Sequence, residues 1–187
     1  MCKPYKIILV GALFFLTTSQ VNEAIGCTTV DECIEEAEKG DADAQMILGY
    51  MYSRGSSALP YDLKKTIKWY KKAAENGSIA AQHNLGAMYY DGIGVVKDYK
   101  KSLTWYEMAA KQGKASTQYA LAVRHRDTYP MKSYAWSNVL LYDDDKGFRQ
   151  HGKELIEDLE TRLTQEQLKQ AAIMADEYVM LYGKIKD

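Results

Sequence analysis

The middle of this chain repeats itself, and this repetition restricts the possible folds more than any other feature of the sequence. Residues 40–55 align with residues 77–92 at an offset of 37, and residues 62–77 align with residues 98–113 at an offset of 36. Periods of this length are typical of repeat proteins. In such proteins each unit buries its apolar face by packing against its neighbours, so we expect a stack of similar units.

Each copy has the pattern of two helices joined by a short loop. Ala44, Leu48 and Met51 are spaced four and three residues apart, which places them on one helical stripe. Gly49 and Gly86 fall in the middle of the first helices, where glycine costs about 1 kcal/mol relative to alanine. A cost repeated in both copies predicts a close approach of the paired helix. Aspartates precede the second helices and glycines follow both helices, as helix caps do: Asp62, Asp98, Gly55, Gly92, Gly77 and Gly113.

A third copy is shorter and departs from the pattern. It begins at Thr117, and its second-helix segment runs from Ser133 to Trp136. It has Arg124 and His125 where the other copies have Met and Tyr. Flanking helices should cap the repeats, one ending at Lys39 and two after a solvated acidic turn at 143–145, over 148–162 and 164–182. The last helix should bury one face and be polar behind it, with these residues inside: Leu168, Ala171, Ala172, Ala175 and Val179.

The two complete copies share A-Q-x-x-L-G-x-M-Y-x-x-G, a short loop, and then D-x-x-K-[TS]-x-x-W-Y-x-x-A-A-x-x-G. This pattern resembles the Sel1-like repeat family, which is related to tetratricopeptide repeats. The resemblance implies an all-α fold, a right-handed α-solenoid of stacked helix pairs with helical caps. We expect a signal peptide at 1–24, a capping helix at 27–39, repeats at 40–142 and capping helices at 143–187. The individual repeats are expected at 40–76, 77–112 and, in degenerate form, 113–142.

The amino terminus is typical of a secretory signal peptide. Lys3 and Lys6 precede the ten-residue apolar run 7–16, and a polar stretch follows. A spanning helix needs about 20 apolar residues, so this run is too short to be a stable anchor. Cleavage after Ser19, Ala24 or Gly26 would each place a small residue at the cut. We expect a protein exported to the periplasm or the medium.

Two cysteines remain after the signal peptide. Cys27 and Cys33 form an even pair, six residues apart, in an oxidising compartment. A disulfide between them is one expectation. The segment from Ala24 to Cys27 also resembles a bacterial lipobox, in which Cys27 would carry a lipid anchor and Cys33 would stay unpaired.

Composition and motifs exclude several functional classes. A formal net charge of -1 argues against nucleic-acid binding through a general electrostatic field. The sequence has no phosphate-binding, dinucleotide-binding, zinc-protease or serine-hydrolase motif. Its three histidines stand at unrelated repeat positions. We therefore expect no catalytic residues, no metal and no cofactor.

What remains is the surface of the stack. In right-handed arrays the first helices line the concave face, which is the usual partner-binding surface. We expect a peptide or helix of another protein to bind along these positions: Met46, Tyr50, Ser53, His83, Ala87, Tyr90, Tyr119, Val123 and Arg126. The resemblance implies a non-catalytic scaffold or adaptor. The alternatives are a secreted hydrolase or β-lactam-binding enzyme, like the cysteine-rich members of the family, and a structural subunit of an envelope complex.

Overall fold

The computed structural model describes Cys27 and residues 29–184. These residues form nine helices and no strand, which confirms the all-α class. The signal segment 1–24, its alternative cut sites and the lipobox residues before Cys27 lie outside the described residues. No helix in the described part of the chain combines the length and the apolar character that crossing a membrane requires.

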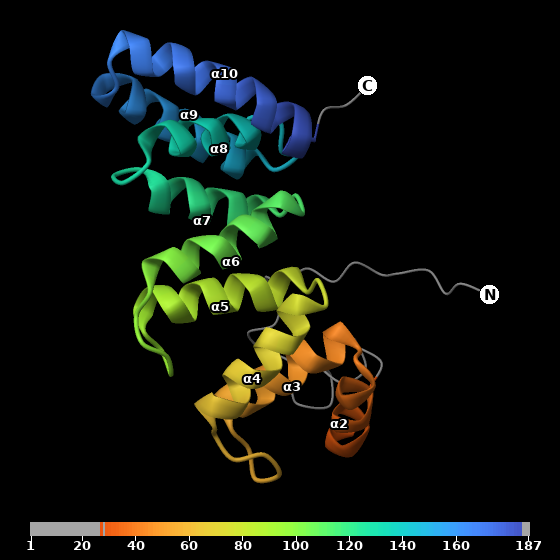
Figure 1. Cartoon of the computed structure of the whole chain (residues 1–187). Coiled ribbons are helices and arrows are strands. Elements are labelled where there is room, and N and C mark those ends of the chain that lie inside the picture. The colour runs from red at the N-terminus through yellow and green to blue at the C-terminus, as the bar shows by residue number, and fades with distance from the viewer. Residues whose placement is uncertain (1–26, 28, 185–187) are drawn as a thin grey trace, which may run out of the picture. The chain divides into compact units, whose positions relative to one another are not determined.

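The chain divides into two compact units, Met1–Gly77 and Ser78–Asp187. Figure 1 labels their helices. The first unit contains α2 (Val30–Lys39), α3 (Ala42–Arg54) and α4 (Leu63–Glu75), and α3 packs on both of the others. The second unit contains three further pairs: α5 (Ile79–Asp91) with α6 (Tyr99–Lys111), α7 (Ala115–His125) with α8 (Pro130–Leu140), and α9 (Lys146–Arg162) and α10 (Gln165–Tyr182), which both pack on α8.

Side-chain caps begin the helices where the sequence predicts them. The carboxylates of Asp62 and Asp98 each accept the backbone N–H three residues further on, at 3.0 and 2.9 Å. Thr164 and Gln167 form a complete capping box at the start of α10. These contacts satisfy N–H groups that have no partner within the helix, and so they fix where each helix starts.

The first two helix pairs pack through glycine. A Cβ atom on Gly49 would lie 2.5 Å from the ring of Tyr70, and one on Gly86 would lie 2.9 Å from the ring of Tyr106. Atoms at these distances overlap, so only glycine lets the tyrosine ring lie flat against the helix backbone. The close approach predicted from the two mid-helix glycines is confirmed.

Buried glutamines link the helices at a repeated position. The Nε2 atom of Gln45 donates to the carbonyl of Ala37, at 2.9 Å, and that of Gln118 donates to the carbonyl of Ala110, at 3.2 Å. Because each glutamine is almost fully buried, these bonds satisfy polar atoms that water cannot reach. The amide oxygens of the aligned glutamines also accept from the end of the second helix of the same pair, Asn76 to Gln45 and Gln112 to Gln82.

The carboxyl-terminal pair closes the core of the second unit. The ring of Trp136, which is 1% exposed, contacts Tyr178 and Tyr182 of α10 at centroid distances of 5.0 and 5.3 Å. Ala171 and Ala175 are buried as predicted. The contacts of Trp136 attach α10 to α8 through Tyr178 and Tyr182, which were not in the predicted stripe.

The outer face of α10 differs from the prediction in two respects. Ala172 is exposed rather than buried, because it lies about 100° around the helix from Ala171. The face behind the stripe is not wholly polar either, since Ile173, Met180 and Leu181 are 72%, 79% and 59% exposed. The prediction of a helix with a polar back is therefore wrong at these positions.

The acidic turn before α9 also differs from the prediction. Asp143 is only 7% exposed, and its carboxylate accepts from Lys184 Nζ at 2.7 Å and from the N–H of Asp145 at 2.9 Å. The carbonyl of Asp143 accepts from Arg149. A fully solvated turn is therefore wrong for Asp143, which holds the carboxyl-terminal end of the structure against the loop.

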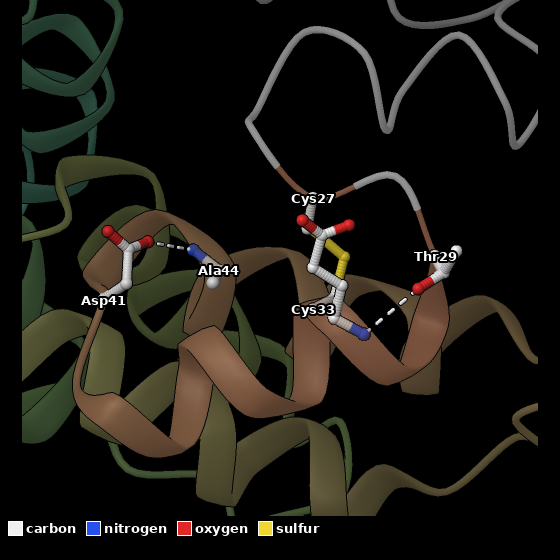
Figure 2. The surroundings of a disulfide bond; sticks show 6 residues. Cys27, Thr29, Cys33, Asp41 and Ala44 are labelled. Atoms are coloured by element: carbon white, nitrogen blue, oxygen red, sulfur yellow. Dashed lines mark hydrogen bonds between the residues drawn. A yellow bond between two sulfur atoms is a disulfide. The ribbon is translucent and has the colours of Figure 1, made fainter.

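Cys27 and Cys33 are joined by a disulfide bond, with their Cα atoms 5.2 Å apart. Both residues are buried, and Cys33 lies in the first turn of α2, where its N–H donates to the carbonyl of Thr29 (Figure 2). The hydroxyl of Thr29 caps α2 by accepting from the N–H of Glu32 at 3.2 Å. The bond ties Cys27, which comes before the N-cap residue Thr29, to the first turn of α2.

Candidate functional site: a cavity in the second unit

A cavity of about 1020 Å³ lies in the second unit between α5, α6, α7 and α8. Tyr90, Tyr99 and Tyr129 line it, and Leu103 and Val123 add apolar surface. The volume is at the upper end of the range for ligand pockets. Most of the other lining residues are polar or charged, so the wall combines aromatic surface with ionic groups.

Arg124 is the central cation of this cavity. Its guanidinium carbon lies 4.6 Å from the ring centre of Tyr90 and 4.4 Å from that of Tyr106, within the range of a cation–π contact with both rings. Its Nη1 atom donates to the carbonyl of Ala120 at 3.2 Å. The two rings hold the planar guanidinium in one orientation at the cavity wall.

His125 and Glu107 form the acid–base part of the wall. His125 is 1% exposed, its Nε2 atom lies 3.6 Å from Glu107 Oε1, and its ring meets Tyr129 edge-on. Lys132 Nζ lies at the same 3.6 Å from that carboxylate oxygen. The His125 ring and then the charge of Lys132 lower the pKa of Glu107, against the opposing effect of burial. Glu107 is therefore an ionised carboxylate at neutral pH.

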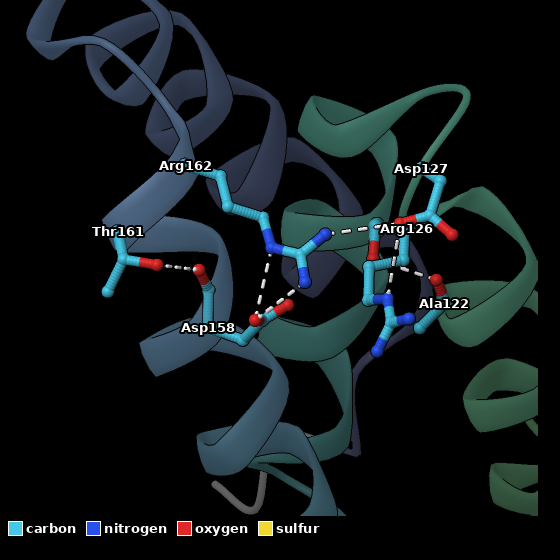
Figure 3. A network of polar contacts seen from close by, with 7 residues as sticks. Ala122, Arg126, Asp127, Asp158, Thr161 and Arg162 are labelled. Carbon is cyan, nitrogen blue, oxygen red and sulfur yellow. Dashed lines mark hydrogen bonds and ion pairs between the residues drawn. The ribbon is translucent and has the colours of Figure 1, made fainter.

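Asp127, the second carboxylate of the cavity wall, belongs to an ion-pair network (Figure 3). Its Oδ1 atom lies 3.4 Å from Arg126 Nε and 3.1 Å from Arg162 Nη1. Arg162 also pairs with Asp158, and the hydroxyl of Thr161 donates to the carbonyl of Asp158. The network connects the loop after α7 with α9 and neutralises Asp127. Across the described residues, no three His, Cys, Asp or Glu side chains are grouped in a way that fits a metal ion.

The predicted binding positions of the first unit lie on α3. Tyr50 is 41% exposed, and Met46 is half-buried. The hydroxyl of Ser53 donates to the carbonyl of Tyr50 at 2.7 Å. These three residues lie outside the cavity, which belongs to the second unit alone.

The predicted positions of the second unit have different surroundings. Tyr90 and Val123 line the cavity, whereas Ala87 packs against the apolar core. The ring of Tyr119 stacks on His151 of α9 at 4.8 Å. The structure thus brings Tyr90 and Val123 together. The others have partners elsewhere: His83 contacts Thr117 and Tyr106, and Arg126 pairs with Asp127.

The prediction from the sequence missed the charged side chains of the cavity. Arg124, His125, Glu107 and Lys132 were absent from the predicted set, because that set was drawn from one stripe of the first helices. A signal was present in the sequence, since the third copy has Arg124 and His125 in place of the Met-Tyr pair of the other copies. This exchange supplies the cation and the imidazole of the cavity.

The helix pairs match the family model "Sel1 repeat" at residues 42–78 and 79–114. The Sel1-repeat-containing protein YbeQ of Escherichia coli K12 is 48% identical over 46 residues, which are 25% of this chain and 14% of that protein. The chain contains Sel1 repeats. It spans about one seventh of the length of YbeQ, so the match concerns the repeats and not the whole relative.

Solved structures agree with this assignment. A Sel1 repeat protein from Oxalobacter formigenes is 29% identical with a TM-score of 0.59, over 69% of this Sel1-like repeat protein and 97% of that chain. The c5321 protein, a protective antigen of uropathogenic E. coli with an SLR fold, is 23% identical with a TM-score of 0.57, over 87% of this chain and 44% of that one. Sel1 repeat proteins are typically non-catalytic scaffolds for protein–protein interactions.

Proposed function

We propose that this Sel1-like repeat protein is an exported, non-catalytic adaptor that holds a peptide or helix of a partner protein in the cavity of its second unit. One observation carries the proposal. The cavity combines three tyrosines with an arginine held between two rings, and tyrosine and arginine are the residues enriched at interface hot spots. The predicted positions Tyr90 and Val123 form part of this site.

A peptide-display selection tests the site. We would select binding peptides on the purified protein and compare their binding to Val123→Trp, which fills the cavity, and to Val96→Trp. Val96 is 89% exposed and does not line the cavity, so this variant is a matched control. The proposal predicts peptides that lose binding to Val123→Trp and keep it to Val96→Trp. Equal binding by both variants, or no enriched peptide, would contradict it.

The proposed export rests on the basic, apolar and polar order of residues 1–24 and on the disulfide that follows. Intact mass of the protein recovered from outside the cytoplasm tests it. A chain that begins between residues 20 and 27 and lacks the mass of two hydrogens supports export with the disulfide. An acyl mass on Cys27 would favour the lipid anchor instead, and an uncleaved chain confined to the cytoplasm would contradict export.

The proposal assigns no catalytic step to the cavity. The carboxylate of Glu107 lies beside His125 and is paired with Lys132. The wall holds no serine or cysteine that could act as a nucleophile. Turnover of the β-lactam nitrocefin by the purified protein, abolished in Glu107→Gln and retained in Glu157→Gln, would contradict a purely binding role and support the hydrolase alternative.

A further inference from the structure

The wall of the cavity has more positively charged side chains than carboxylates to pair with them. Glu107 lies near both Lys132 and His125, and Asp127 lies near two arginines outside the wall. Lys100 and Arg124 differ from these groups. Among the described residues, no carboxylate oxygen lies within 4.0 Å of either side chain's nitrogen atoms. Both carboxylates of the wall are therefore occupied, while two of its cations have no anionic partner.

Arg124 also has hydrogen-bonding capacity that the fold does not use. A guanidinium carries five N–H donors. Within the described residues, Nη1 donates to the carbonyl of Ala120, and the buried Nε has no acceptor. The rings of Tyr90 and Tyr106 contact the guanidinium carbon, whereas the N–H groups of a guanidinium point outward in its plane. Carboxylates are the groups that bind such an edge with two parallel hydrogen bonds.

His125 is a second polar group that the fold leaves incomplete. It lines the cavity at 1% exposure, and neither ring nitrogen has a hydrogen-bond partner within the described residues. Glu107 at 3.6 Å is too distant for a hydrogen bond. Buried polar atoms without partners cost free energy, so a ligand that pairs with them gains free energy on binding.

We propose that the cavity selects an acidic segment of its partner and that one carboxylate of this segment binds edge-on to Arg124, with Lys100 adding a second positive charge. This inference rests on the proposed function, because it names the chemistry of the peptide that the cavity holds. Charge complementarity carries it. The tyrosines of the wall contact the residues on either side of the acid, and His125 bonds to the backbone of the same segment.

Short peptides with a single acid test this chemistry. The first is a five-residue alanine peptide with a central glutamate, acetylated and amidated at its ends. The second has glutamine in place of the glutamate. The third has alanine only and a free carboxyl terminus, which separates a side-chain carboxylate from a terminal one. Each is titrated into isotope-labelled protein while the Nε–H resonance of Arg124 and the cavity amides are followed by NMR.

We expect one carboxylate peptide to shift the Arg124 Nε–H resonance and to bind at least about tenfold more tightly than the glutamine peptide. Arg124→Gln should abolish this preference. Arg126→Gln is the matched control, because Arg126 lies two residues away, pairs with Asp127 and does not line the cavity, and it should retain the preference. Dispersion of the amide spectrum shows that both variants are folded.

Three results would overturn the inference: equal affinity for the glutamate and glutamine peptides, a preference that survives in Arg124→Gln, or no shift of the Arg124 resonance by any carboxylate peptide. These results are separable from failure of the proposed function. Peptides from the display selection that shift the Val123 amide without any preference for acids would leave the binding cavity in place and remove only its selectivity. Selected peptides that shift no cavity resonance would remove both.

Discussion

The ring of Tyr106 lies directly against the backbone of Gly86, where a Cβ atom would come within 2.9 Å of three ring atoms. Tyr106 is fully buried, so the ring cannot swing away without disturbing the core around it. The same relationship holds between Tyr70 and Gly49 in the first unit. Each of these two helix pairs therefore depends on one glycine for its contact distance.

Gly86→Ala should destabilise the protein. In an open helix this change would stabilise by about 1 kcal/mol. Here the added methyl group must displace a buried ring, and overpacking typically costs about 1–3 kcal/mol. Whether Gly86→Ala raises or lowers the free energy of unfolding therefore tests the close approach of Tyr106. Urea unfolding measures it, with Ala172→Leu on the exposed face of α10 as a control that adds more volume without a buried neighbour. A more stable Gly86→Ala variant would refute the close approach.

Ser102→Ala should lower the free energy of unfolding by about 1 kcal/mol. The hydroxyl of Ser102 is buried and donates to the carbonyl of Gly86 at 2.7 Å, which the same close approach makes possible. Thr161→Ala is the control, because its hydroxyl makes a bond of 2.7 Å to Asp158 on the exposed surface. Both changes gain helix propensity, so only burial separates them. Equal stability of the two variants in urea would mean that the buried bond contributes nothing.

Reduction of the Cys27–Cys33 bond should destabilise the first unit by roughly 2–3 kcal/mol at most, the value that loop-closure entropy gives for a short loop. Thermal unfolding with and without reductant measures this difference. The Cys27→Ser, Cys33→Ser double variant is the matched control and should not respond to reductant. If the wild type unfolds at the same temperature in both conditions, the bond does not stabilise the first unit.

The stability of the second unit should fall in mild acid because of His83. Burial, followed by the charges of Lys114 and Arg124, lowers the pKa of His83 to about 4 from 6.5. Between these two pH values the unfolded chain binds a proton that the folded protein excludes, so stability decreases as pH falls from 6.5 towards 4. Urea unfolding across this range measures the slope.

His83→Gln should flatten that dependence, whereas His151→Gln, which alters an exposed ring, should leave the slope of the wild type unchanged. Glu107 also contributes to the loss of stability in acid, because its pKa in the folded protein lies below its usual value. The comparison between variants isolates the contribution of His83. Identical slopes for His83→Gln and the wild type would show that its proton is not excluded from the folded state.

The sequence was sufficient for features that depend on local spacing. The caps at Asp62, Asp98 and Thr164 and the close approach at Gly86 follow from residue types at fixed positions of a helix pair. The irregular third pair also balances the sizes of the two side chains at the positions of this contact. In this pair Ala122 stands at the position of Gly86, and Ser137 stands at the position of Tyr106. The first helix thus has a larger residue than glycine, and the second helix has a smaller residue than tyrosine.

Features that depend on distant residues were not predictable in the same way. Asp143 is buried because Lys184, 41 residues later, pairs with it. The cavity depends on where two successive pairs place Tyr90, Glu107 and Arg124, which no local pattern specifies. The Arg124–His125 exchange was visible in the sequence. Its role in the cavity could be inferred only once the structure placed the aromatic rings around Arg124 and His125.

We propose that the partner binds in the cavity of the second unit. Site-specific photocrosslinking in the producing cell tests it most directly, with benzoylphenylalanine placed at Thr104, which lines the cavity, or at Val96, which does not. We predict a discrete crosslinked partner from position 104 that is absent from position 96. Tyr90→Ala should greatly reduce this adduct, since loss of a hot-spot aromatic costs at least about 2 kcal/mol of binding, while the exposed control Tyr61→Ala should keep it. An adduct of equal yield from positions 104 and 96, or one that persists in Tyr90→Ala, would contradict the claim.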